Sequence, residues 1–214
     1  ACALRLAEAG ADVVVNYVTS SNEAELVAEQ IAAMGRNVAC VRADVSHEDD
    51  VEEMLQFLSE KFGRLDILVH NAATGGFRPL SVTTQRHFDA AMHTNVMSLV
   101  HLLKAASPML QQGSGRGKAV VLSSHGTHMA LPMYGIIGGS KAALTALARH
   151  WALELGDTGG TVNVVEAGLV DLRQNQAVLR TRREEARERV DELGRNHQGL
   201  EAQRSSIQSE LGRI

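Results

Sequence analysis

A regular alternation of short apolar runs with longer helical patterns constrains the fold of this chain more than any other feature. The apolar runs cover residues 11–18, 37–45, 65–72, 117–124 and 159–168. They are rich in Val, Leu, Ile and Ala, and each is too short for a stable helix. A short run that is apolar throughout is typical of a strand buried on both faces of a parallel sheet.

Patterns with helical periodicity fill the intervals between these runs. They cover residues 20–35, 47–63, 85–111 and 135–156, and we expect Pro108 to bend or end the third of them. Strands that alternate with helices of this length predict right-handed βαβ units, and therefore an α/β fold with a doubly wound, Rossmann-type parallel sheet. Ligands of such sheets bind beyond the carboxyl ends of the strands, so the residues that follow each strand are the first candidates for chemistry.

The composition changes near Asp171. Residues 1–171 hold 12 Lys and Arg against 18 Asp and Glu, together with all the aromatic residues and prolines. Residues 172–214 hold 9 Lys and Arg against 7 Asp and Glu, and apolar residues recur there every seven positions from Leu179 to Ile214. We therefore expect an incomplete Rossmann-type domain over residues 1–171 and a polar helical tail over residues 172–214, which is either a weak coiled coil or a non-native extension.

Charge and cysteine content argue against several classes of protein. The formal net charge is -4 and the pI is about 6.1, whereas a nucleic-acid-binding domain is normally basic. No stretch approaches the ~18 consecutive apolar residues of a membrane span, and no signal peptide opens the chain. Cys2 and Cys40 form neither a disulfide framework nor a paired metal-binding motif. We expect a cytoplasmic protein that binds neither nucleic acid nor membranes.

Two closely spaced histidines, His125 and His128, were the natural candidates for a metal site. A zinc site needs a third and a fourth ligand, and no cysteine or carboxylate lies close to them in the sequence. We therefore predict no metal and interpret both histidines as polar residues that line a pocket.

Polar and small residues follow the strands in a characteristic order. They are Asp44-Val45, HNAATGG (70–76), Ser123-Ser124 and YGIIGGSKAALTAL (134–147). In this order and spacing the chain resembles the short-chain dehydrogenase/reductase superfamily over about residues 1–171. It looks closest to the divergent branch of the enoyl-acyl-carrier-protein reductases, particularly the NADPH-dependent type III enzymes. The resemblance implies reduction of the 2,3 double bond of an enoyl thioester carried by acyl carrier protein, in fatty acid biosynthesis.

The spacing of tyrosine and lysine distinguishes this branch from most of the superfamily. Most members have Tyr-x3-Lys, but the corresponding position here is Ile137, which cannot donate a proton. Tyr134 and Lys141 give Tyr-x6-Lys, the spacing associated with enoyl reductases. At 3.6 residues per turn, offsets of four and of seven both return to within about 40° of the same helix face, so the geometry permits either.

The resemblance assigns the catalytic roles to three residues. Tyr134 would supply a proton or a hydrogen bond to the developing enolate oxygen. Lys141 would hold the ribose of the nicotinamide and favour the ionised phenol through its positive charge. Ser124 lies 17 residues before Lys141, at the offset of the superfamily's catalytic serine, although its role beside Tyr-x6-Lys is less defined.

Other residues are assigned to the cofactor through the same resemblance. Asn71, Ala72 and Ala73 match a turn of the NNAG type, whose small residues let the backbone approach the adenine ribose. Asn95 occupies the position of an asparagine that kinks a helix and orders water near the lysine, although a simple helix-packing role explains it equally well.

Two further segments complete the expected cofactor site. Asp44 and Val45 match the positions that hold the adenine. Ala167 and Gly168 match part of the usual Pro-Gly-x-Val-x-Thr segment, but Ala167 replaces the proline and Leu172 replaces the residue expected to contact the nicotinamide amide.

The residues after the first apolar run indicate which nicotinamide cofactor is used. Asn16 stands where NAD-specific members carry an acidic residue, and the hydroxyl groups of Thr19, Ser20 and Ser21 follow it. No carboxylate there would repel a 2′-phosphate, and hydroxyls are present to bind one. NADPH is therefore expected rather than NADH, although the basic residue often found nearby is missing.

The chain begins with a segment that looks like the inside of the first helix of this fold. The resemblance implies a preceding central strand and a glycine-rich TGxxxGIG loop, which would bind the pyrophosphate. Without that strand, we expect a gap in the sheet between the strands at 12–18 and 66–71. The expected partners are an enoyl substrate linked to acyl carrier protein and further copies of the chain in a dimer or tetramer. The alternatives are a ketoreductase that acts on 3-oxoacyl groups and an inactive fragment that serves as an interaction module.

Overall fold

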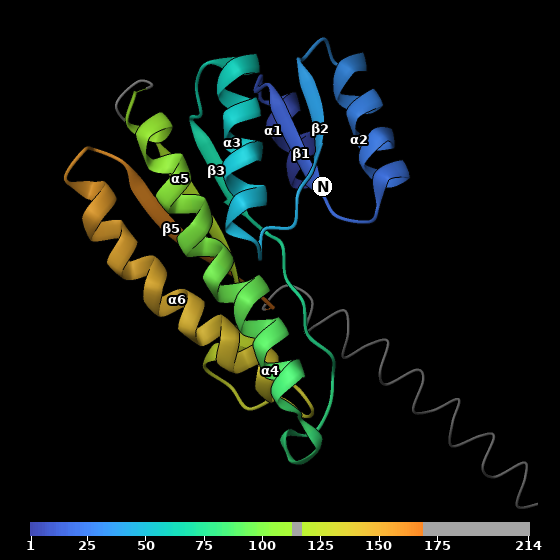
Figure 1. Ribbon diagram of the computed structural model, residues 1–214, viewed down its shortest axis with the longest axis vertical. Coiled ribbons are helices and arrows are strands. Elements are labelled where there is room, and N and C mark those ends of the chain that lie inside the picture. The colour runs from blue at the N-terminus through green and yellow to red at the C-terminus, as the bar shows by residue number, and fades with distance from the viewer. Residues whose placement is uncertain (113–116, 169–214) are drawn as a thin grey trace, which may run out of the picture. The chain divides into compact units, whose positions relative to one another are not determined.

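A computed structural model describes residues 1–112 and 117–168 of the chain, and it has the predicted α/β fold with parallel strands (Figure 1). The elements are α1 (Cys2–Glu8), β1 (Val13–Tyr17), α2 (Ser21–Ala33), β2 (Val38–Arg42), α3 (Glu48–Phe62), β3 (Ile67–His70), η1 (Leu80–Val82), α4 (Gln85–Met92), η2 (His93–Met97), α5 (Ser98–Gln112), β4 (Lys118–Ser124), η3 (His125–Thr127), α6 (Gly135–Gly156) and β5 (Thr161–Ala167). The predicted tail, residues 172–214, lies outside the described residues.

The strands form two separate parallel sheets. One sheet has the order β1-β2, with Val13 opposite Val38, and the other has the order β3-β4-β5, with His70 opposite Val121. Among the described residues, no strand pairs with both β1 and β3, so the expected gap between them is present. The tertiary structure therefore keeps the strand order of a doubly wound fold but leaves the sheet divided.

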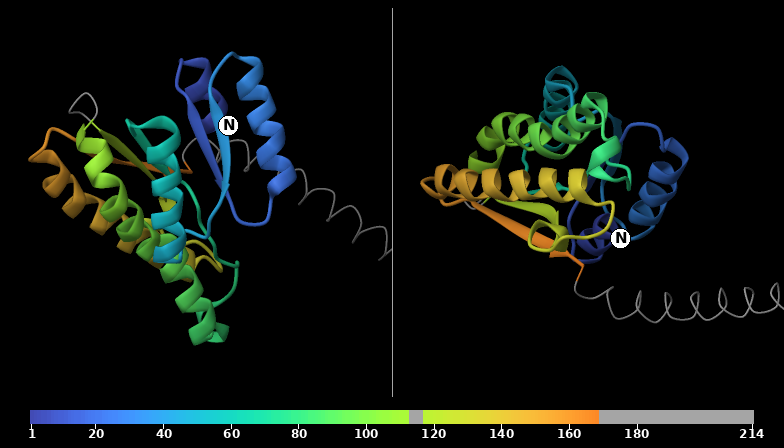
Figure 2. Two further views of the ribbon diagram at one scale, coloured as in Figure 1. Left: turned by 45° about the horizontal axis from the view of Figure 1, so that its top comes forward. Right: turned by 90° about the horizontal axis from the view of Figure 1, so that it is seen from below.

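The helices cover these sheets and create two apolar cores. The smaller core is formed by α1 and α2 on the first sheet, around Ala7, Val13 and Ile31. The larger core lies among α3, α5, α6 and the strands, and Val121, Leu99, and Leu144 are fully buried there. Helices α5 and α6 lie against the same face of the three-stranded sheet (Figure 2). None of the helices in the described part of the chain is long and apolar enough to cross a membrane.

The predicted single helix over residues 85–111 is wrong in its details. It is divided into α4, a turn of π-helix over His93–Met97, and α5. Pro108 does not end α5, which continues to Gln112, because a helix tolerates a proline when packing compensates for the lost backbone bond. The irregularity lies instead around Asn95, at the carboxyl end of β3.

Candidate active site

The loop from β4 to α6 brings two of the predicted catalytic residues together. Ser124 is the last residue of β4, and Tyr134 is the residue before the first turn of α6. The Tyr134 hydroxyl group donates a hydrogen bond to Ser124 Oγ at 2.9 Å. The ring of Tyr134 also packs against the ring of Phe77, with the ring centroids 5.6 Å apart. Residues separated by ten positions in sequence are thus fixed as one polar pair.

Glycine at position 126 is required for this arrangement. A Cβ atom at Gly126 would lie 2.5 Å from two carbon atoms of the Tyr134 ring. The ring can occupy its position only because no side chain is present there. Sequence reasoning did not identify Gly126, because the contact depends on how the loop returns to the helix.

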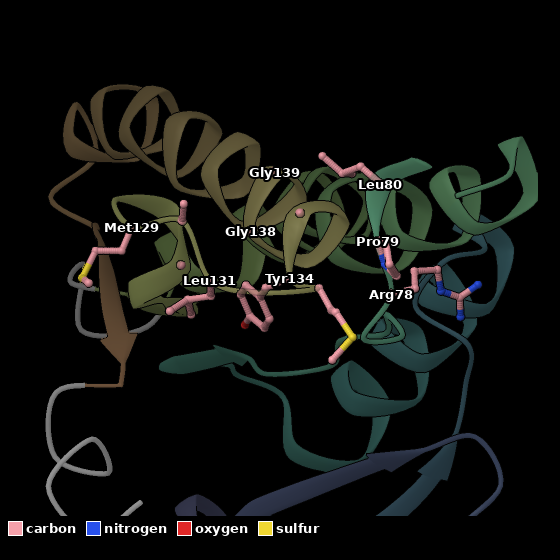
Figure 3. Close-up of a pocket in the computed structure, with 12 residues that line it drawn as sticks. Arg78, Pro79, Leu80, Met129, Leu131, Tyr134, Gly138 and Gly139 are labelled. Carbon is pink, nitrogen blue, oxygen red and sulfur yellow. The ribbon is translucent and has the colours of Figure 1, made fainter. Parts of the chain in front are cut away.

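A cavity of about 330 Å³ lies beside Tyr134. Figure 3 shows Tyr134 in the middle of its lining, with Met129 and Leu131 on one side and Arg78 and Leu80 on the other. The two sides are held together because the backbone amide of Arg78 donates to the carbonyl oxygen of Met133 at 2.8 Å. A largely apolar cavity whose lining carries the phenol of Tyr134 and the side chain of Arg78 suits a substrate with an acyl body and one reacting polar end.

Lys141 lies one turn and a half into α6 and is 6% exposed. Its ammonium group donates to the carbonyl oxygen of Leu122 at 2.6 Å and is not hydrogen-bonded to Tyr134 or Ser124. Burial lowers the pKa of Lys141, because the charged form loses its hydration. The structure therefore places the third predicted catalytic residue in the same region, but with a different partner.

Asn95 fixes the loop that follows β3. Its side chain is fully buried, and it both accepts from the amide of Thr74 at 2.7 Å and donates to the carbonyl oxygen of Thr74 at 2.8 Å. It also donates to Ser140 Oγ at 2.9 Å, which links the loop to α6 beside Lys141. The turn of π-helix presents this side chain inward, as such turns often do at functional sites.

Ile137 occupies the position of the tyrosine in a Tyr-x3-Lys enzyme, and it packs against the loop after β3. A Cβ atom at Gly75 would lie 2.5 Å from Ile137 Cγ1, so the backbone there is in close contact with the isoleucine side chain. An apolar side chain in this close contact leaves Tyr134 as the phenol of the site. The second tyrosine of the chain, Tyr17, lies in β1.

His70 is a buried residue of this region that sequence reasoning overlooked. It is the last residue of β3 and is 1% exposed, and its Nε2 atom lies 2.7 Å from Ser98 Oγ. Burial, together with the nearby charge of Lys141, lowers the pKa of His70 from 6.5 to about 4. The available signal was the histidine of HNAA in a position where the resemblance leads one to expect asparagine.

The residues predicted to select the cofactor belong to the other sheet and are arranged differently. The side-chain amide of Asn16 donates to the carbonyl oxygens of Ala43 at 2.8 Å and Val41 at 3.3 Å. Ser20 is exposed at the start of α2 and makes no capping hydrogen bond. In this conformation Asn16 joins β1 to β2, and the exposed hydroxyl of Ser20 remains available to a ligand.

Asp44 and Val45, the residues expected at the adenine, differ in which of their groups a ligand can reach. Asp44 accepts hydrogen bonds from the amide and hydroxyl groups of Ser46, and the Ser46 hydroxyl is the main reason why the pKa of Asp44 is lowered. Val45 is 4% exposed and belongs to the larger core, so only its backbone is available to a ligand.

The remaining residues assigned to the cofactor lie at the carboxyl ends of β3 and β5. Asn71, Ala73 and Ala167 are exposed there, whereas the side chain of Ala72 packs on the larger core. Gly168 has a φ of 143°, which favours glycine. Leu172 lies outside the described residues.

This set of residues fits a dinucleotide at the adenine and nicotinamide ends. Small exposed residues follow β3 and β5, and the buried cation Lys141 reaches Leu122 of β4, the strand between them. Within residues 1–112 and 117–168, no glycine-rich turn joins a strand to a helix N-terminus, so no candidate for the pyrophosphate contact is present there.

The interpretation of the two histidines as pocket residues is wrong for the cavity beside Tyr134, because neither of them lines it. His128 Nε2 instead lies 2.8 Å from Glu166 Oε1 at the end of β5. This carboxylate is 38 residues away in sequence and reaches the histidine because β4 and β5 are neighbours. No group of three or more His, Cys, Asp or Glu side chains arranged to hold a metal occurs among the described residues.

Comparisons with known proteins agree with this architecture. A family model described as Enoyl-(Acyl carrier protein) reductase matches residues 1–204. Among curated relatives, hydroxynaphthalene reductase arp2 of Aspergillus fumigatus is 34% identical over 76% of this chain and 59% of its own length. The 1-cyclohexenylcarbonyl-CoA reductase of Streptomyces collinus is 33% identical over 79% of this chain and 59% of its own length.

Solved structures give the same result. A short chain dehydrogenase from Burkholderia cenocepacia in complex with NADP has a TM-score of 0.72 and 34% identity, over 77% of this chain and 67% of that one. The enoyl-[acyl-carrier-protein] reductase (NADH) from Aquifex aeolicus has a TM-score of 0.70 and 30% identity, over 78% of this chain and 65% of that one. The chain thus spans about three fifths of the length of the curated relatives described above. By its family match, its parallel strands and its tyrosine and lysine at the carboxyl ends of those strands, the chain belongs to the short-chain dehydrogenase/reductase superfamily of oxidoreductases.

Proposed function

We propose that the protein to which this chain belongs is an NADPH-dependent reductase of the 2,3 double bond of an enoyl thioester on acyl carrier protein. The observation that carries the proposal is that Ile137 fills the usual tyrosine position against Gly75, which leaves Tyr134, in Tyr-x6-Lys spacing, as the phenol of the site. The family description and the enoyl-[acyl-carrier-protein] reductase from Aquifex aeolicus support the same choice, and the relative from Streptomyces collinus is named as a reductase of a CoA thioester.

The proposed chemistry divides between the cofactor and the side chains. A bound nicotinamide supplies the hydride. Tyr134 holds a proton on its hydroxyl oxygen beside the cavity, in a hydrogen bond to Ser124 Oγ, and would donate it to the substrate once the hydroxyl group turns away from Ser124. Lys141 would hold the ribose, and the apolar cavity wall would exclude water from the acyl group.

The preference for NADPH rests on the exit of β1. Asn16 places no negative charge there, and Ser20 presents a hydroxyl group to solvent. The related dehydrogenase from Burkholderia cenocepacia was solved with NADP, whereas the enoyl reductase from Aquifex aeolicus is titled as an NADH enzyme. We also propose that the protein acts as a homo-oligomer in the cytoplasm.

Reduction of a ketone is the second candidate. The relative arp2 is named as a hydroxynaphthalene reductase, and the Ser124–Tyr134 hydrogen bond would equally suit protonation of an alkoxide. The substrate decides between the two, because a ketoreductase acts on acetoacetyl thioesters and an enoyl reductase acts on crotonyl thioesters.

The test is a parallel assay of crotonyl and acetoacetyl thioesters with NADPH and NADH. It uses the chain itself and a version extended at both ends with the matching segments of a relative. Faster oxidation of NADPH with the crotonyl thioester supports the proposal. Preference for the acetoacetyl thioester would reject it in favour of ketone reduction, and an extended chain that binds no dinucleotide would reject both.

A further inference from the structure

The hydrogen bonds of His70 define which of its ring nitrogens carries the proton. Ser98 Oγ donates to the carbonyl oxygen of Thr94 at 2.6 Å, so its hydrogen is already used. The same oxygen lies 2.7 Å from His70 Nε2 and must therefore accept from it. Nε2 of His70 therefore carries hydrogen. Because burial lowers the pKa of His70 to about 4, the ring is neutral at pH 7 and Nδ1 carries an unshared electron pair.

This electron pair is buried and has no partner. His70 is 1% exposed, and its Nδ1 atom has no partner with hydrogen-bond geometry among the described residues, although the backbone of His70 itself acts on the ring and raises its pKa against the larger effect of burial. A buried acceptor without a donor is costly, by about 1–3 kcal/mol, and its presence in a folded protein calls for an explanation.

Among the described residues, Lys141 is short of hydrogen-bond acceptors, whereas His70 Nδ1 lacks a donor. An ammonium group has three hydrogens to donate, but that of Lys141 has one described partner, the carbonyl oxygen of Leu122. The side chain is 6% exposed, so solvent has little access to the other two hydrogens. A second acceptor would stabilise the buried cation.

The register of the sheet brings these two groups near each other. His70 pairs with Val121, which immediately precedes Leu122. His70 and Val121 are both buried, His70 contacts Ser98 of α5, and the Lys141 ammonium group reaches the carbonyl oxygen of Leu122 from α6. Among the described residues, Lys141 is the only one whose charge acts on the pKa of His70.

We propose that His70 is a positioning residue for Lys141, whose ammonium group donates a hydrogen bond to His70 Nδ1, either directly after a small rotation or through one water molecule. This role rests on the proposed function, in which Lys141 also holds the ribose. The three ammonium hydrogens would then bind Leu122, His70 and the ribose, and the lysine would stay cationic although it is buried.

The length of the side chain provides a matched pair of variants. The polar atoms of asparagine coincide with the position of Nδ1, and those of glutamine coincide with the position of Nε2. His70→Asn therefore keeps the acceptor for Lys141, and His70→Gln keeps the contact with Ser98. If His70 had only a structural role, the pKa of Lys141 would not differ between the two variants in this way.

The measurement is a pH titration of the lysine Cε signals by NMR on the complete chain labelled with ¹³C-lysine. The chain has four lysines, Lys61, Lys104, Lys118 and Lys141, and Lys141→Arg assigns the signal. We expect His70→Gln to lower the pKa of Lys141 by about one unit, as for the loss of one hydrogen bond to a charged group, and His70→Asn to lower it by less than half of that. Equal shifts in the two variants, or none in His70→Gln, would overturn the proposal.

A second measurement needs no variant at His70 and so does not depend on the folding of one. The ¹⁵N signals of His70 in the unmodified chain report which nitrogen carries hydrogen. We expect hydrogen on Nε2 at pH 7, and hydrogen on Nδ1 would overturn the proposal by itself. Neither measurement uses a substrate or cofactor, so a failed enoyl reductase assay and a failed link between His70 and Lys141 are distinguishable.

Discussion

Asn95 and Asn16 make similar hydrogen bonds in two regions that differ in exposure. Asn95 is fully buried and ties the loop after β3 to α6. Asn16 is exposed and ties β1 to the residues that end β2. The region of β3, β4 and α6 thus holds its polar side chains away from water, whereas the region of β1 and β2 leaves them in solvent.

This difference in exposure shows which end of the proposed site has its side chains fixed before any ligand binds. Tyr134, Ser124, His70 and Lys141 have defined partners from distant segments, so a substrate would meet a fixed arrangement. Of the proposed cofactor-selecting residues, the exposed Asn16 bonds only backbone carbonyl groups, and Ser20 is exposed without a capping hydrogen bond. We therefore expect substitutions in the first region to have large effects and substitutions in the second to have small ones.

The largest expected effect is at the phenol. Tyr134→Phe should reduce the rate of crotonyl thioester reduction by the extended chain by about 10²–10⁴-fold, the usual contribution of a positioned proton donor. Steady-state kinetics with NADPH measures it. Ile137→Ala is the matched control and should have a mild effect, because Ile137 has no proton to give. Equal losses in the two variants would contradict the assignment of Tyr134.

The two asparagines provide a direct test of the comparison. Asn95→Ala should lower the free energy of unfolding by about 2–3 kcal/mol, because it removes the hydrogen bonds that the fully buried Asn95 side chain makes to Thr74 and Ser140. Asn16→Ala should cost less than about 1 kcal/mol, because water can replace its amide. Urea denaturation of both variants measures this, and similar costs would show that the two regions are equally organised.

Acid sensitivity should come from the buried histidine. The ordinary pKa of a histidine is 6.5, and that of His70 in the folded protein is about 4. Between pH 4 and pH 6.5 the unfolded chain therefore binds more protons than the folded one. The stabilisation from keeping His70 neutral is complete above about pH 6.5 and is lost as the pH falls towards 4, by about 3 kcal/mol in total.

Denaturation measured between pH 4 and pH 7 tests this expectation. His70→Asn should remove most of this part of the pH dependence, because asparagine does not titrate. An unchanged pH dependence in the variant would assign the acid sensitivity to other groups.

The smallest expected effect concerns the cofactor. Asn16→Asp places a carboxylate at the exit of β1, where it would repel a 2′-phosphate and bind a ribose diol. The ratio of kcat/KM for NADPH to that for NADH should fall about tenfold in the extended chain, which corresponds to about 1.4 kcal/mol. A preference of the unmodified protein for NADH would contradict the interpretation of residues 16–21.

The sequence by itself predicted the features that depend on local pattern. The alternation of short apolar runs with helical periods predicted the order of strands and helices and the α/β fold, because these periods follow from backbone geometry. The spacing of Tyr134 and Lys141 and the HNAA segment predicted where the chemistry would lie, because parallel strands bring their carboxyl ends to one edge.

The tertiary structure decided everything that depends on contacts between distant segments. It paired Tyr134 with Ser124 beside Gly126 and directed Lys141 to Leu122. It also brought His70, which the sequence analysis overlooked, against Ser98 of α5, and it paired His128 with Glu166. It also gave the helix predicted over residues 85–111 a turn of π-helix at Asn95, whose buried side chain bonds the backbone of Thr74. Hydrogen bonds and close packing of this kind are selected by the folded environment, and no local pattern in the sequence encodes them.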